Sequence, residues 1–132
     1  MDYARLIVTE ETFAKHLGPE LVSLEPDKVV VNMPWGEHLG IGRVHGGAIS
    51  ALVDVSATAC FWADPTLTGQ EQGATVGFTI NYLALSVATT LTATATIRRR
   101  GGTLCTGDVS ITNPEGVEVA TAIVTYKLNR KT

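Results

Sequence analysis

The chain has 132 residues, of which 45% are hydrophobic and 17% charged, and its formal net charge is −3. This length predicts a single domain, residues 1–132, with one buried core. The composition excludes a disordered chain, which would be poor in apolar residues and rich in charge. The slightly acidic balance gives no reason to expect nucleic acid or an anionic membrane as a partner.

Nothing in the sequence indicates a membrane segment, a leader peptide or a metal site. No apolar run reaches the roughly 18 residues that cross a bilayer. The acidic N-terminus lacks the basic and then apolar order of a signal peptide. Cys60 and Cys105 have neither the spacing of metal ligands nor that of a disulfide framework. We therefore expect a cytoplasmic protein.

The first third of the chain predicts one short helix and two strands. The helix is expected over residues 9–17, with Thr9 as its N-cap and Gly18 just beyond its C-terminus. The next expected elements are two strands and an irregular glycine-rich loop, at residues 21–24, 28–33 and 34–44.

A long helix is predicted over residues 47–62, which contain no proline and no glycine after Gly47. Apolar side chains cover most of its circumference, as in a buried helix. Only Gly47, Ser50, Asp54 and Thr58 form a small and polar stripe along one side. Because one sheet can cover only one side of a helix, we expect a second subunit to cover the rest.

The remainder of the chain predicts strands. Residues 89–98 alternate between apolar residues and threonines, and Gly101-Gly102 and residues 113–116 are turn signals. We therefore expect a four-strand antiparallel meander at residues 75–83, 89–98, 104–112 and 117–128. One long helix packed on one antiparallel sheet is an α+β arrangement.

Asp54 is the most informative residue because it lies in the middle of the apolar helix. A buried, unpaired carboxylate is costly or takes up a proton, and perturbed carboxylates concentrate in active sites. Asp54 is therefore a candidate catalytic group. The alternative is that it only faces water along the polar stripe.

Gly46 and Gly47 stand at the start of this helix, where the first amides lack intrahelical partners and carry partial positive charge. They are candidates for an oxyanion hole, and the alternative is a tight loop-to-helix turn. Gly47 and Asp54 are separated by about 10 Å along the helix axis. Reacting atoms must lie about 3 Å apart, so both residues can act on one substrate only if they come from different subunits.

The histidines and arginines have two interpretations each. His45 is a loop brace or a base, and residues 98–100 are a solvated arginine edge or a phosphate contact. A dinucleotide site is disfavoured, because the glycine-rich segment has His45 at its sixth position and antiparallel strands follow it.

Residues 42–54, G-R-V-H-G-G-A-I-S-A-L-V-D, resemble the G-x-x-H-G-G-x-x-x-x-L-x-D signature of hotdog-fold acyl-CoA thioesterases. The subgroup that they resemble most is the phenylacetate-pathway type. The order of the expected strands and helix also resembles that of the family, over residues 20–128. It implies a hotdog fold, with a long central helix wrapped by an antiparallel sheet. It also implies a homodimer or dimer of dimers whose active sites are shared between chains.

The resemblance also implies roles for single residues. The Gly47 N–H would polarise the thioester carbonyl, Asp54 of the neighbouring chain would be the nucleophile or activate water, and Thr75 would orient that water. Six residues before the motif histidine the family often has Asn or Gln, where this chain has Leu39. Arg43 is a further phosphate candidate. The other implied substrate contacts are His38, His45, Gly46, Arg98, Arg99 and Arg100.

The sequence thus predicts hydrolysis of an aryl- or medium-chain acyl-CoA to the free acid and CoA. CoA is half of the substrate, and no metal or other cofactor is expected. A non-catalytic acyl-CoA-binding protein is the first alternative, favoured by Leu39. A hydratase or dehydratase is the second, and would need a histidine–acid pair formed across chains.

Overall fold

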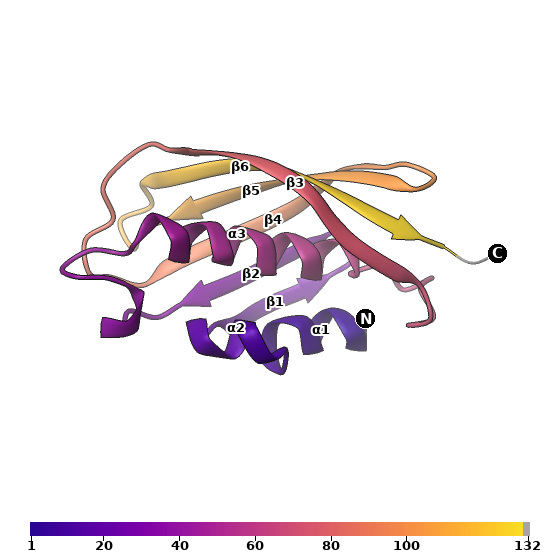
Figure 1. The fold of residues 1–132 in the computed structure, drawn as a ribbon, viewed down its shortest axis with the longest axis horizontal. Coiled ribbons are helices and arrows are strands. Elements are labelled where there is room, and N and C mark those ends of the chain that lie inside the picture. The colour runs from indigo at the N-terminus through magenta and orange to yellow at the C-terminus, as the bar shows by residue number, and fades with distance from the viewer. Residues whose placement is uncertain (131–132) are drawn as a thin grey trace.

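Six strands form one antiparallel sheet in the computed structural model, which describes residues 1–130 (Figure 1). The order across the sheet is β1-β2-β4-β5-β6-β3. The strands are β1 (Glu20–Glu25), β2 (Lys28–Met33), β3 (Gln72–Tyr82), β4 (Leu91–Arg100), β5 (Leu104–Thr112) and β6 (Glu118–Asn129).

One long helix lies along one face of this sheet, and two short helices lie beside it near β1 (Figure 1). This is the predicted α+β hotdog arrangement. Within residues 1–130, no helix is long and apolar enough to cross a membrane. The helical segments are α1 (Asp2–Thr9), α2 (Thr12–Leu17), the short 3₁₀ turn η1 (Glu37–Leu39) and α3 (Gly46–Phe61).

The core lies between α3 and the sheet. Along β4, Leu91, Ala93 and Ala95 are buried and the threonines between them are half-buried, as the alternation predicted. From the helix side, Leu52 and Phe61 are fully buried. Each methylene removed from water contributes about 0.8 kcal/mol, so this contact fixes how α3 lies on the sheet.

The face of α3 that points away from the sheet carries the predicted stripe. Gly47 is exposed, and Ser50, Asp54 and Thr58 are half-buried, whereas most other positions of the helix are buried. Within one chain, therefore, the sheet covers one side of α3 and the stripe stays accessible.

The predicted four-strand meander is wrong in one strand. Strands β4, β5 and β6 follow one another as expected, but β3 pairs with β6 and β2 takes the place beside β4. The physical reason is the connection over residues 83–90, which is longer than a hairpin turn and lets the chain cross to the other side of the sheet. As a result β3 is an edge strand, and most of its residues are exposed.

The predicted helix over residues 9–17 is in fact two helices. Thr9 ends α1, and its hydroxyl donates to the Arg5 carbonyl at 3.0 Å instead of capping the next helix. The N-cap of α2 is Glu11, whose carboxylate accepts two backbone N–H groups. Gly18 adopts the left-handed conformation at the end of α2, as predicted.

Candidate active site

The loop before α3 is built to place His45 at the helix start. The His45 N–H donates to the Leu39 carbonyl at 2.7 Å, and the Val44 N–H donates to the Ser86 carbonyl at 2.9 Å. A Cβ at Gly40 would overlap the Arg43 carbonyl oxygen, so this position requires glycine. The loop therefore arrives at α3 in one fixed direction.

His45 satisfies three of the first four amides of α3. Its Nδ1 accepts from the Gly47 N–H at 2.8 Å, and its carbonyl accepts from Ala48 at 2.9 Å and Ile49 at 3.1 Å. Because Nδ1 is an acceptor here, the ring proton is on Nε2. The bracing role considered for His45 is therefore what the structure shows.

The remaining amide belongs to Gly46, whose N–H has no acceptor among residues 1–130. The expectation that the Gly47 N–H is free for a carbonyl is corrected by this geometry, because the His45 ring already occupies that amide. The unpaired, partly positive N–H at the start of α3 is that of Gly46.

Tyr82, at the end of β3, holds the peptide of Gly46 from the other side. Its hydroxyl donates to the Gly46 carbonyl at 2.9 Å and lies 2.6 Å from the Ser50 hydroxyl. A Cβ on Gly46 would lie 3.4 Å from the tyrosine ring. The hydrogen bond therefore fixes the peptide between Gly46 and Gly47, and the ring packs against the Cα of the residue that carries the free N–H.

Asp54 lies two turns further along α3 and is paired with Thr75 of β3. The Thr75 hydroxyl donates to Asp54 Oδ1 at 2.7 Å, so the structure brings together these two predicted residues. The carboxylate lines a pocket of about 250 Å³ between α3 and the N-terminal helices, which also includes Thr58 and Trp62. Oδ1 is occupied, and Oδ2 forms no hydrogen bond with residues 1–130.

Gly46 and Asp54 of one chain are not neighbours. Eight residues of helix separate them, which corresponds to about 12 Å along the axis. Neither glycine of the motif therefore meets the carboxylate within a single chain. Whichever glycine N–H binds the carbonyl, it can act together with Asp54 only if the two residues come from different chains, as predicted.

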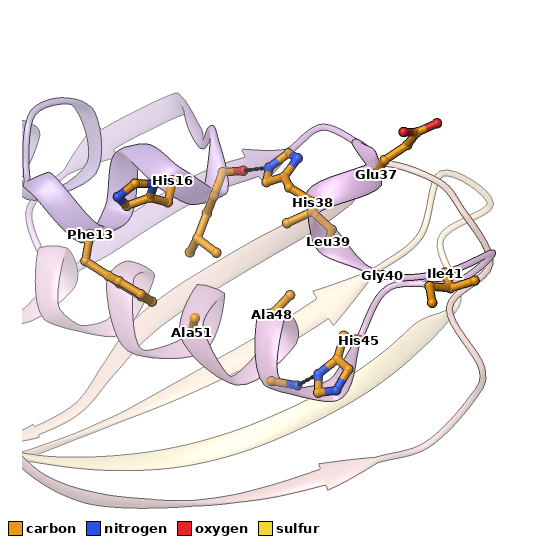
Figure 2. A pocket seen from close by; sticks show the side chains of 12 residues that line it. Phe13, His16, Glu37, His38, Leu39, Gly40, Ile41, His45, Ala48 and Ala51 are labelled. Atoms are coloured by element: carbon orange, nitrogen blue, oxygen red, sulfur yellow. Dashed lines mark hydrogen bonds between the residues drawn. The ribbon is translucent and has the colours of Figure 1, made fainter.

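A larger pocket, of about 500 Å³, opens beside the start of α3 (Figure 2). We call it the Phe13 pocket, because the Phe13 ring points across it toward Ala51 (Figure 2). Most of its walls are apolar, and Glu37 is its one carboxylate. It is lined by Phe13, His16, Leu17, Glu37, His38, Leu39, Gly40, Ile41, His45, Gly47, Ala48 and Ala51.

His38 and Leu39 both belong to this pocket but differ in what they offer. Leu39 is only 2% exposed and packs into the core, so it presents no polar group. His38 lies on the wall with its Nε2 3.5 Å from the Leu17 carbonyl oxygen (Figure 2). His38 is thus the polar side chain beside the position where the family often has Asn or Gln.

The three consecutive arginines lie on β4, away from the start of α3. Arg100 donates to the carbonyls of Phe61 and Cys60 at the end of α3 and pairs with Asp27 at 2.9 Å. Its predicted role as a phosphate contact is therefore corrected to a structural one. Arg98 is exposed and pairs with Asp108 at 2.9 Å, and Arg99 is exposed.

The residues that sequence reasoning missed are on α2. Phe13 and Leu17 are spaced four apart and project from one side of that helix into the pocket. This spacing was a detectable signal. Two backbone N–H groups, from Phe13 and Ala14, hold the pKa of the capping Glu11 below its usual range. The carboxylate thus fixes the helix turn that carries Phe13.

Residues 41–120 match the family model described as "Thioesterase superfamily". The chain belongs to the thioesterase superfamily. The matched range includes the start of α3, Asp54 and Thr75, whereas Phe13 and His38 of the Phe13 pocket precede it. The predicted family is confirmed. No curated protein sequence matches the chain.

Solved structures show the same fold over nearly the whole of this thioesterase-superfamily chain. A thioesterase family protein from Silicibacter pomeroyi is 20% identical, with 97% of this chain and 96% of that chain covered and a TM-score of 0.87. The E. coli PaaI protein from the phenylacetic acid degradation operon is 24% identical, with 99% and 94% covered and a TM-score of 0.86. Zebra fish thioesterase superfamily member 2 is 25% identical, with 98% and 94% covered and a TM-score of 0.82.

Proposed function

We propose that this protein is an acyl-CoA thioesterase that converts an aryl- or medium-chain acyl-CoA to the free acid and CoA. The observation that carries the proposal is the Asp54–Thr75 hydrogen bond of 2.7 Å on the face of α3 that the sheet leaves uncovered. It is an oriented carboxylate next to open space, within a domain of the thioesterase superfamily. The apolar Phe13 pocket suits the acyl group.

The proposed reaction uses one carboxylate and one amide. Water bonds to the thioester carbon while Asp54 Oδ2 takes its proton, and the carbonyl oxygen becomes an oxyanion. The Gly46 N–H stabilises that oxyanion. The C–S bond then breaks, CoA leaves as a thiolate, and the proton on Asp54 passes to it. A second route, in which Asp54 itself attacks and water releases the acid, uses the same residues.

We propose that two chains build each site. The outer edge of β3 has no partner strand in the described part of the chain, and an exposed edge favours pairing with a second copy. On β3, Thr75 contacts Asp54 and Tyr82 contacts Gly46. If two β3 strands pair antiparallel with Thr75 beside the partner's Tyr82, then Asp54 of one chain comes next to Gly46 of the other. We also place the protein in the cytoplasm, where its two free cysteines stay reduced.

The test is release of free thiol from a panel of aromatic and aliphatic acyl-CoAs. Asp54→Ala should lower turnover by about 10²- to 10⁴-fold, the range for loss of a general base, while the oligomer and its thermal unfolding stay unchanged. Asp108→Asn is the matched control, because Asp108 is an aspartate in an exposed ion pair on the sheet. Wild-type turnover in Asp54→Ala would disprove the assignment.

A non-catalytic acyl-CoA-binding protein is the second candidate. Leu39 favours it, because an apolar core residue stands where the family often has an amide side chain. It predicts that acyl-CoAs bind without thiol release. Saturable binding with no release from any ester of the panel would support this candidate against the enzyme.

A further inference from the structure

A second pocket, of about 290 Å³, lies on the other side of the start of α3, and it contains Arg43, which the family resemblance suggested as a phosphate contact. We call it the Arg43 pocket. Besides Arg43, it includes the hydroxyl-bearing residues Tyr82 and Ser86 and contains no carboxylate. It is lined by Arg43, Val44, His45, Gly46, Ile49, Tyr82, Ala84, Leu85 and Ser86.

The two pockets meet at the free amide. His45 lines both of them, Gly47 belongs to the Phe13 pocket, and Gly46 belongs to the Arg43 pocket. A thioester whose oxygen accepts the Gly46 N–H thus lies at their junction. One half of the substrate must then enter each pocket, and the chemistry of the walls decides which half.

Charge separates the two possibilities. The acyl half is neutral and apolar, whereas the CoA half ends in phosphates. The Phe13 pocket is lined by apolar residues, three histidines and the Glu37 carboxylate, and that carboxylate would repel a phosphate. The Arg43 pocket has a guanidinium, and guanidinium groups bind phosphate oxygens through paired N–H donors.

Two side chains of the Arg43 pocket have unused hydrogen-bonding capacity. Among residues 1–130, the guanidinium of Arg43 forms no ion pair and no side-chain hydrogen bond, in contrast to Arg98 and Arg100. The Ser86 hydroxyl, on a residue only 5% exposed, has no partner in the same part of the chain. Buried hydroxyls are normally paired, so we expect a polar group of a bound molecule to pair with the Ser86 hydroxyl.

We infer that the Arg43 pocket binds the CoA half of the substrate. Arg43 contacts a phosphate, and Ser86 bonds an amide of the pantetheine arm. The Phe13 pocket then holds the acyl group, and the thioester lies between them at Gly46. This inference rests on the proposed function, because it gives the direction in which an acyl-CoA lies across the same site.

The experiment compares KM for an acyl-CoA with KM for the matching acyl-pantetheine, which lacks the phosphates. Arg43→Gln should raise KM for the acyl-CoA about tenfold, as expected for a lost charge-assisted contact, with kcat unchanged. The same variant should leave KM for the acyl-pantetheine unchanged. Ser86→Ala should raise KM for both substrates, since both carry the pantetheine amides.

Two variants give the controls. Arg43→Lys keeps the positive charge and should restore much of the affinity. Arg5→Gln removes an exposed arginine of α1 outside both pockets and should leave both KM values unchanged. Equal KM values for the acyl-CoA in Arg43→Gln and wild type would overturn the inference. So would a raised KM in Arg99→Gln together with an unchanged KM in Arg43→Gln.

Binding of CoA alone, measured by calorimetry, separates this inference from the proposed function. If the protein binds CoA without hydrolysing any ester, and Arg43→Gln weakens that binding, then the site is right and the enzyme assignment is wrong. If thiol is released with KM independent of Arg43, then the enzyme assignment is right and the site is wrong.

Discussion

Replacing Gly46 by proline removes a single N–H group at the start of α3. Gly46 is the first helical residue, where proline is favoured because that N–H has no intrahelical partner. The preceding His45 has φ −62° and ψ 139°, the extended conformation that a residue before proline adopts. The Cβ of a residue at 46 lies 3.4 Å from the Tyr82 ring, an ordinary contact. The helix should therefore persist without its free amide.

The expected loss is that of one oxyanion donor, about 10²- to 10³-fold in kcat or 2.7–4 kcal/mol. The free energy of unfolding should change by less than about 0.5 kcal/mol, as for substitutions that disturb no contact. Free-thiol release at saturating acyl-CoA measures the first quantity, and denaturant unfolding measures the second. Gly46→Ala is the control, because it adds the same Cβ and keeps the N–H.

Turnover of Gly46→Pro within twofold of wild type would refute the reasoning, since it would mean that the carbonyl does not use this amide. Such a result would assign the oxyanion donor to Gly47, whose N–H would first have to break its hydrogen bond with His45 Nδ1. If Gly46→Ala falls as far as Gly46→Pro, the side chain and not the donor is responsible.

Further predictions concern the shared site, the arginines and the thiols. An equal mixture of Asp54→Ala and Gly46→Pro chains, unfolded and refolded together, should recover about a quarter of wild-type activity, because half of the dimers contain one intact shared site. Sites formed within single chains would recover none. Arg100→Ala should destabilise the fold by about 2 kcal/mol through lost charged hydrogen bonds without changing KM. Arg98→Ala removes only an exposed ion pair and should leave the denaturant midpoint close to that of wild type. Burial raises the pKa of Cys60 to about 12, so this thiol should not react with Ellman's reagent at pH 8 until the protein unfolds. Cys105 is also buried, so the reagent should not reach it in the folded protein. Rapid labelling of the folded protein would contradict this.

Local sequence patterns predicted the elements that form one face of the core. The alternation along β4 and the valines of β2 indicated strands, and the proline-free apolar run indicated α3, because each pattern follows the period of its element. Strand order was harder. The position of β3 beside β6 depends on which strands bury apolar area together across the sheet. The connection over residues 83–90 contains no signal for that pairing.

The candidate site was predictable to the level of residue identity but not of single atoms. Asp54 and Thr75 were found because a carboxylate in an apolar helix and a family motif both point to them. The choice between Gly46 and Gly47 could not be made in the same way. It depends on the orientation of the His45 ring, which accepts a hydrogen bond from the Gly47 N–H and leaves the Gly46 N–H unpaired.

The stripe on α3 explains why catalysis and assembly depend on the same residues in the proposed enzyme. A second helix can approach only where side chains are small, and Gly47, Ser50 and Ala51 supply that surface. The polar groups needed for hydrolysis must also face open space, and the half-buried Ser50, Asp54 and Thr58 of this stripe do so within one chain. Asp54 lies about 12 Å from Gly46 on its own helix, so a partner helix running in the opposite direction is the simplest way to bring the two together. On this reasoning the spacing between glycine and aspartate is set by the two-fold axis and not by the reach of one side chain.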